Sequence, residues 1–434
     1  MRTGKAEIGI LVQERVLIQV SNEKRGTIMN PTRRDFFKAA LLLPAGVYLE
    51  KFQALAAPLR GAVKITAIKA LQLDFQFDGC LVRIETDAGI TGYGETGIDA
   101  KMTRALIPQL HLIGADPLAI ERHFQAMTGI IHPNRPSIPF ISGIDIALWD
   151  VAGKILDLPI YKLMGGPLRD AVQMYSHGDF LKDMSSPASC REWAQLIREQ
   201  PEGFTTFKIE PMQALHGESV GPEVSTAQLA KIAQGFANVR EAVGESIDIA
   251  VHCHNQYDLP SAIAVSKATE AIHPQWFEDP LNHVEYCEAW MAFKRATRTP
   301  VLTGEKVEMV EEFKPFIDNV AVDIIHPDIS FAGGFSGCRK IADYAALNRV
   351  PMALHNVGSL VRTYASVHLA ASIPNFYRCE SRLGHAGRVV EQMSADKSQL
   401  IKNSMFRLPQ GPGLGLEMDP DFMRKHTPRG EDWA

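Results

Sequence analysis

The chain has 434 residues, a length typical of two or three domains, or of one large barrel with an appended domain. Apolar residues make up 46% of it and charged residues 22%, so low-complexity and collagen-like classes are excluded. The net charge of −5 argues against nucleic acid as the main partner, and no run of 18 uncharged apolar residues is present to form an integral membrane segment.

Residues 1–57 have the layout of a targeting segment. Arg33 and Arg34 lie in the motif Thr-Arg-Arg-Asp-Phe-Phe-Lys, followed by a short apolar stretch and Ala-Leu-Ala-Ala at 54–57. This order is typical of a secretory signal and resembles a twin-arginine signal, whose machinery exports folded proteins. We therefore predict a periplasmic or other extracytoplasmic location, with Met29 as the start and residues 1–28 upstream of it. A cytoplasmic location is the alternative.

Residues 62–165 are predicted to form a small α+β unit. Val63–Leu71 and Cys80–Thr86 are rich in strand-forming residues, and a turn at 87–89 leads into Thr91–Glu95 as a hairpin. Asp116 followed by Pro117 predicts the N-cap and first residue of a helix. A second helix is predicted from apolar residues spaced by 4, 3 and 4, which are Ile144, Leu148, Val151 and Ile155.

Between residues 168 and 384, short apolar runs alternate with helix-length segments, which indicates βαβ units and a parallel sheet. The runs are Phe204–Ile209, Ile247–Val251, Gln275–Phe277, Pro300–Thr303, Val320–Ile325, Pro351–Leu354 and Asn375–Arg378. The ionisable residues that close the later runs are His254, Glu278, Glu305, Asp328, His355 and Glu380. Their spacings of 24, 27, 23, 27 and 25 match one βα unit of a TIM-type barrel. An open doubly wound sheet would need a Gly-rich phosphate loop, which is absent.

In such a barrel the carboxyl ends of the strands converge on one mouth, where active sites lie. The residues expected there are Lys208, Glu210, His252, His254, Glu278, Glu305, Asp328, His355 and Glu380. So many charged groups in one pocket would repel one another unless a cation neutralised them. The pattern therefore predicts a hard divalent metal ion such as Mg²⁺.

Several motifs of the barrel region carry a family resemblance. They are Gly203–Lys208, Trp276–Pro280, Thr303–Glu305, His326–Ser330 with Gly333-Gly334, and Ala353–Asn356. Together with Thr91–Glu95, Ile144–Asp150 and Pro409–Gly415, they resemble the enolase superfamily, mandelate racemase/muconate lactonizing enzyme subgroup, closest in motif to acid-sugar dehydratases. The resemblance implies an α/β fold: a TIM-type (β/α)7β barrel at 168–384, with an α+β capping domain at 62–165. The C-terminal segment, 385–434, would return to that cap.

The resemblance also implies an activity, the metal-dependent abstraction of the proton α to a carboxylate. For an acid-sugar dehydratase this leads to dehydration of a sugar acid to a 2-keto-3-deoxy acid, a lyase reaction on a small-molecule carboxylate. The implied catalytic residues are the base His355 with its partner Asp328, the general acid His254, and the charge-stabilising or substrate-bonding Lys208 and Glu380. The implied metal ligands are Glu278 and Glu305, and Asn356 and Arg382 are assigned to substrate binding.

Two positions depart from the family pattern. Glu210 replaces the second lysine of a Lys-x-Lys pair, and His252 replaces the aspartate expected as third metal ligand. Imidazole suits softer ions such as Mn²⁺ better than it suits Mg²⁺. Three possibilities stay open: His252 ligates the ion, Glu210 supplies the lost carboxylate, or the metal is bound weakly.

These departures leave alternative functions open. A racemase or epimerase of a 2-hydroxy or related acid needs a base on each face of the substrate, and Glu210 replaces one of them. A metal-poor exported binding protein on the same fold is the other alternative. The choice of acid is expected to depend on cap loops near residues 74–79, 94–100 and 131–140, and a homo-oligomer is expected.

Overall fold

The computed structural model describes residues 63–75, 79–129, 137–218, 221–282, 287–382 and 388–433, all within one compact unit, Leu59–Ala434. The predicted targeting segment, 1–57, lies outside these ranges, as do parts of two of the predicted substrate loops, 76–78 and 131–136. None of the helices in the described ranges combines the length and the hydrophobicity needed to cross a membrane.

The first part of this unit is a three-stranded antiparallel sheet with helices. Its strands are β1 (Ile65–Leu71), β2 (Cys80–Thr86) and β3 (Thr91–Thr96), and its helices are α3 (Ala100–Leu106), α4 (Ile120–Thr128), α5 (Ile138–Ile155) and α6 (Ile160–Leu163). Helix α5 is apolar on nearly all sides and is buried against β3, as expected of a helix without a polar face. A Cβ on Gly94 would lie 2.0 Å from the carbonyl oxygen of Gly143, so this contact requires glycine.

One predicted helix start is wrong. Helix α4 begins at Ile120 with Ala119 as its N-cap, not at Asp116 and Pro117. The Asp116 carboxylate instead accepts a hydrogen bond of 2.9 Å from the backbone N–H of Leu118. This local bond stabilises a turn, which is the usual competitor of an aspartate N-cap.

A closed parallel barrel follows. Its strands are β4 (Ala171–His177), β5 (Thr206–Ile209), β6 (Asp248–His252), β7 (Phe277–Glu278), β8 (Val301–Thr303), β9 (Ile324–Ile325), β10 (Met352–Leu354) and β11 (Phe376–Ser381). They pair in sequence order, and β11 pairs with β4 to close the ring. This confirms the predicted (β/α)7β barrel. Strand β4 was not among the apolar runs recognised in the sequence.

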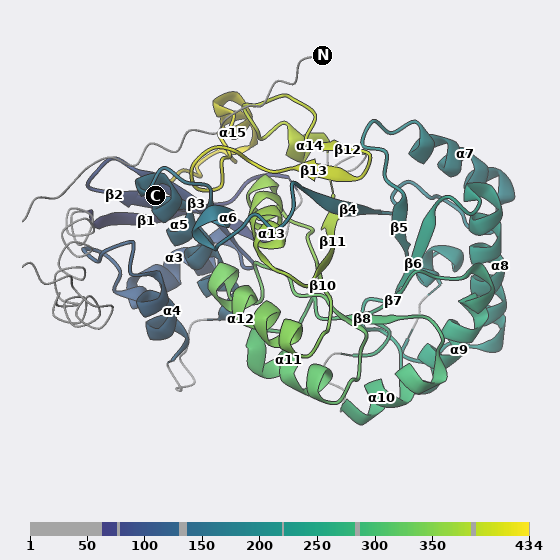
Figure 1. Cartoon of the computed structure of the whole chain (residues 1–434). Coiled ribbons are helices and arrows are strands. Elements are labelled where there is room, and N and C mark those ends of the chain that lie inside the picture. The colour runs from purple at the N-terminus through teal and green to yellow at the C-terminus, as the bar shows by residue number, and fades with distance from the viewer. Residues whose placement is uncertain are drawn as a thin grey trace, which may run out of the picture. The chain divides into compact units, whose positions relative to one another are not determined.

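Seven helices connect the strands and surround the barrel (Figure 1). They are α7 (Pro187–Arg198), α8 (Thr226–Val243), α9 (Leu259–Thr269), α10 (Cys287–Ala296), α11 (Met309–Asp318), α12 (Gly334–Leu347) and α13 (Leu360–Ser372). Local sequence fixes several of their starts. Ser225 and Gln228, for example, form a reciprocal capping box at the beginning of α8.

The C-terminal segment contains α14 (Arg388–Glu391), β12 (Ile401–Lys402), β13 (Met405–Arg407) and α15 (Pro420–His426). Strand β13 pairs antiparallel with the barrel strand β4. Further along, the backbone N–H of Leu414 donates to Asp150 of α5 at 2.7 Å. Nδ1 of His426 lies 2.7 Å from Oδ1 of Asp74. The segment therefore contacts both the barrel and the N-terminal α+β region.

A fully buried arginine links that region to the barrel mouth. Arg362 of α13 lies 2.8 Å from Glu95 of β3 through Nε and 3.1 Å from Asp328 through Nη1. Glu95 also accepts a hydrogen bond of 3.0 Å from the backbone N–H of Ser359. The orientation of Asp328 is thus fixed by a side chain that is itself anchored to the cap sheet.

Candidate active site

The barrel mouth opens into a cavity of about 730 Å³. Side chains from the strand ends and the loops after them line it: His177, Asp179, Glu210, His254, Glu305, Lys306, Glu308, Phe331, His355, Val357 and Arg382. His254 follows β6 and His355 follows β10. These strands are four apart in either direction around the closed ring. The two imidazoles therefore come from opposite sides of the mouth.

His355 and Asp328 form a buried dyad. Nδ1 of His355 lies 2.7 Å from Oδ2 of Asp328, and both residues are nearly inaccessible to solvent. The carboxylate accepts a hydrogen bond from Nδ1–H, so Nε2 is the ring atom that can take up or release a proton. Nε2 lies 3.4 Å from Oε2 of Glu305, so the basic atom is beside a predicted metal ligand.

The charges around His355 strongly favour its protonated form. Burial lowers its pKa, but Glu380, Asp328 and Glu305 outweigh burial and raise the pKa to about 9. The arginine link and the His355 hydrogen bond lower the pKa of Asp328 in spite of its burial. The dyad therefore consists of an ionised carboxylate and an imidazole with high proton affinity.

Lys208 lies beneath the cavity in a buried ion-pair network. Its Nζ is 2.8 Å from Oε1 of Glu278 and 2.8 Å from Oε1 of Glu380, and only 2% of the residue is exposed. Burial alone would raise the pKa of Glu278, but Lys208 and two nearby histidines lower it to about 2. The pKa of Glu380 is likewise well below its usual range because of Lys208, His177 and His355. Both carboxylates are ionised.

Histidine 252 lies between the two predicted metal ligands. Its Nε2 is 3.6 Å from Oε1 of Glu278 and 3.5 Å from Oε2 of Glu305. The donor atoms of these three residues and of Asp279 all lie within 4.8 Å of one another. Burial and Lys208 lower the pKa of His252, but Glu278 and Glu305 outweigh both and raise it.

The spacing of these donors fits a cation. The distances from Nε2 of His252 to Glu278 and Glu305 are both long for a hydrogen bond. The ring nitrogens of His252 and Oε2 of Glu305 are buried without a hydrogen-bond partner in the described structure. Two ligands bound to one ion at about 2.1 Å stand about 3.0–3.5 Å apart. A lone pair remains on Oε1 of Glu278 after the bond to Lys208. The residues present therefore suit a divalent ion.

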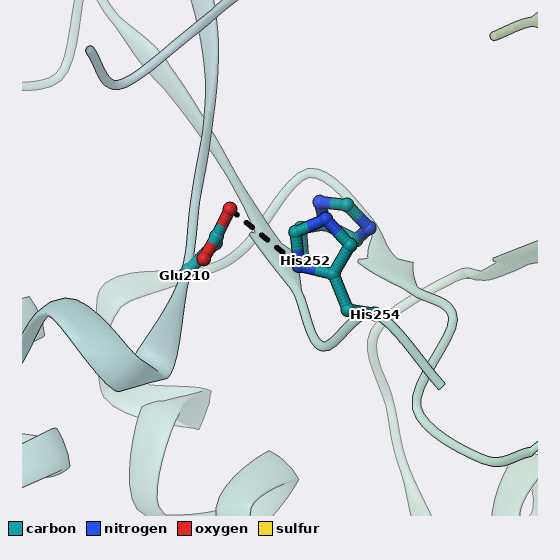
Figure 2. A group of neighbouring side chains, drawn as sticks. All are labelled: Glu210, His252 and His254. Atoms are coloured by element: carbon teal, nitrogen blue, oxygen red, sulfur yellow. Dashed lines mark ion pairs between the residues drawn. The ribbon is translucent and has the colours of Figure 1, made fainter. Parts of the chain in front are cut away.

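Glu210 and His254 form a separate pair at the edge of this group (Figure 2). Nδ1 of His254 is 3.5 Å from Oε1 of Glu210, and about a third of each side chain is exposed. The ring of His254 packs on His252, with ring centroids 3.9 Å apart. Burial and the neighbouring His252 lower the pKa of His254 to about 3, so its resting imidazole is neutral.

The two predicted substrate residues differ in position. Arg382 lines the cavity and donates from Nη1 to the Val357 carbonyl at 3.2 Å. Asn356 is 1% exposed and is not among the residues that line the cavity. Its amide donates to Thr363 at 2.9 Å and to the Glu380 carbonyl at 3.3 Å, so it is occupied in holding the strand ends together.

Four residues near the site were not singled out as site residues from the sequence: Tyr175, His177, Asp279 and His326. The Tyr175 hydroxyl lies 2.8 Å from Nε2 of His326, and Nδ1 of His326 faces Glu278 at 3.9 Å. His177 pairs with Glu380. Two of the four belong to β4, the missed strand, whose sequence also ends in an ionisable residue. Extending the pattern by one strand would have found His177.

Comparison with known proteins agrees with this geometry. The family model described as "Enolase C-terminal domain-like" matches residues 191–422. The model of the "Mandelate racemase / muconate lactonizing enzyme, N-terminal domain" matches residues 73–165. The first match covers the barrel after β4 with most of the tail, and the second covers the α+β region after β1.

Individual relatives match over most of their length. A D-xylonate dehydratase of Haloferax volcanii is 33% identical over 386 residues, which cover 86% of this chain and 92% of the relative. A D-gluconate dehydratase of Thermoproteus tenax is 28% identical over 80% of this chain and 69% of the relative. The crystal structure of a mandelate racemase/muconate lactonizing enzyme-like protein from Rubrobacter xylanophilus has a TM-score of 0.74 at 29% identity. The match covers 86% of this chain and 99% of that protein. The chain belongs to the enolase superfamily, in its mandelate racemase/muconate lactonizing enzyme subgroup.

Proposed function

We propose that the protein is a metal-dependent hydro-lyase that dehydrates a sugar acid to a 2-keto-3-deoxy acid. The observation that carries the proposal is the arrangement of His355 and His254 on opposite sides of one cavity, with Glu305 beside His355. A base and an acid so placed can act on neighbouring carbons of one substrate. The relatives named as D-xylonate and D-gluconate dehydratases support this reaction class.

The first step is proton removal by His355. With His355 in its neutral form, Nε2 takes the proton from the carbon α to the carboxylate, while the electron pair of the broken C–H bond moves toward the carboxylate. Asp328 keeps the ring in the tautomer that exposes Nε2 and stabilises the imidazolium that forms. A divalent ion at Glu278, Glu305 and His252 would offset the charge of Glu305 and the charge that develops on the substrate carboxylate. Lys208 adds a fixed positive charge beneath the same place.

The second step is loss of the β-hydroxyl. The electron pair forms the C=C bond of an enol as the C–O bond breaks, and His254 supplies the proton that turns the leaving hydroxide into water. The imidazole of His254 is neutral in the free protein. In the complex, the negative charge of the substrate raises the pKa of this imidazole, so His254 acts as the acid there. The enol then tautomerises to the 2-keto acid.

A screen of aldonic and aldaric acids in D₂O tests the proposal. A dehydratase forms a semicarbazide-reactive 2-keto acid from at least one of them. A racemase or epimerase exchanges the α-hydrogen for deuterium without forming keto acid, which would transfer the second-base role to His254 or Glu210. A protein that binds an acid but does neither would be the exported binding protein, and the hydro-lyase proposal would fall.

We also propose export by the twin-arginine route, on the sequence of residues 32–57. Replacing both Arg33 and Arg34 with lysine should leave the precursor in the cytoplasm, because the export receptor reads both guanidinium groups. The measurement is fractionation followed by immunoblotting, with Lys38→Arg as the matched control. Unchanged mature protein outside the inner membrane in the double variant would exclude this route.

A further inference from the structure

We infer that the metal centre is a mixed imidazole–carboxylate site, in which His252 joins Glu278 and Glu305 and selects Mn²⁺, Co²⁺ or Zn²⁺ over Mg²⁺. The inference rests on the proposed function only in that both require a divalent ion. Metal binding can be measured without turnover, so the two can fail separately.

The position of His252 carries the first part of the argument. The side chain is 1% exposed, and Nε2 stands nearly equidistant, 3.5 and 3.6 Å, from one oxygen each of Glu305 and Glu278. A buried imidazole in that position normally makes hydrogen bonds, and neither ring nitrogen makes one within the described structure. An ion held jointly by the three side chains would satisfy Nε2 of the imidazole and one oxygen of each carboxylate.

The position of Glu210 carries the second part. If this carboxylate replaced the aspartate that the family has at position 252, its oxygens should group with those of Glu278 and Glu305. They group instead with His252 and His254, and the Glu210 carboxylate is directed toward His254 (Figure 2). Its backbone N–H donates to Gln213 at 3.0 Å, which fixes the start of a short 3-10 helix at Pro211–Ala214. A relocated carboxylate is therefore disfavoured.

The chemistry of the three donor groups gives the preference for transition ions over Mg²⁺. A site of three carboxylates suits Mg²⁺, a hard ion that holds oxygen ligands and sheds water reluctantly. Replacing one carboxylate with a neutral imidazole removes a negative charge and adds a nitrogen donor. Both changes weaken the binding of Mg²⁺ more than that of first-row transition ions, which accept imidazole as a ligand more readily.

The experiment is metal binding to the purified full chain after EDTA treatment and dialysis. Titration with Mn²⁺ followed by electron paramagnetic resonance, with Mg²⁺ as competitor, gives both affinities. Electron spin-echo spectroscopy of the Mn²⁺ form should show coupling to one imidazole nitrogen. In His252→Asp this coupling should vanish, and the Mn²⁺ preference over Mg²⁺ should fall, because a carboxylate replaces the nitrogen donor. His252→Asn, which supplies no carboxylate, should lose the coupling without gaining Mg²⁺ affinity.

Glu210→Gln is the matched control, since it alters the neighbouring carboxylate and should leave the Mn²⁺ preference over Mg²⁺ and the nitrogen coupling unchanged. Circular dichroism of each variant shows that the fold is retained. Loss of metal in Glu210→Gln with unchanged binding in His252→Asp would overturn the inference in favour of a relocated carboxylate. Bound Mn²⁺ without nitrogen coupling in the wild type would also overturn it, because His252 would then stand beside the ion without binding it.

Discussion

Replacing His355 with asparagine should lower kcat for dehydration by about 10²–10⁴-fold, the usual contribution of a general base. Asparagine has a similar size and can still hydrogen-bond to Asp328, but it has no basic nitrogen to direct toward the substrate. Exchange of the α-hydrogen in D₂O should be lost to the same extent, because proton removal precedes loss of the hydroxyl. The measurements are keto-acid formation and proton NMR of the recovered substrate.

The control for this variant is His216→Asn. His216 is exposed and pairs with Asp183, away from the residues that line the cavity. Its replacement should leave both rates unchanged, while thermal unfolding shows that both proteins remain folded. If His355→Asn retained activity within a factor of about three of the wild type, His355 would not be the base.

The sequence could predict this dyad because barrel geometry is periodic. Asp328 and His355 are 27 residues apart, close to one βα unit, so they fall at the ends of neighbouring strands. In a closed parallel barrel such residues must meet at the mouth. The same reasoning brought Glu278, Glu305 and His252 together before any distance was known.

Features that depend on side-chain direction could not be predicted in this way. The family resemblance assigns Asn356 to substrate binding, but its amide donates to Thr363 and to the Glu380 carbonyl. The contact between Tyr175 and His326 joins two strands that are not neighbours in the barrel, so no local pattern indicates it. The link from Arg362 to Glu95 likewise requires the cap sheet to be docked on the barrel.

The second large effect is expected from the buried ion pairs of Lys208 with Glu278 and Glu380. Lys208→Met should lower the free energy of unfolding of the metal-free protein by about 3–5 kcal/mol at neutral pH, the usual cost of removing one partner from a buried ion pair. Methionine fills similar space, but Glu278 and Glu380 would then lose the cation that lies 2.8 Å from each. The measurement is the urea midpoint after EDTA treatment, with Lys231→Met as control. That lysine is exposed and pairs with Glu218, so its loss should change stability by less than about 1 kcal/mol.

The electrostatic cause can be separated from a packing cause with a second replacement. In Lys208→Met combined with Glu380→Gln, one of the two uncompensated negative charges is removed while the shape of the side chain is kept. If like-charge repulsion and lost pairing cause the instability, the double variant should be more stable than Lys208→Met alone, so that the two effects are strongly non-additive. Additive losses would mean that Lys208 stabilises the barrel floor through the packing of its aliphatic chain. In that case the two carboxylates would have to be neutralised by other groups that lie within 4.0 Å of them, His177 and His355 for Glu380 and His252 for Glu278.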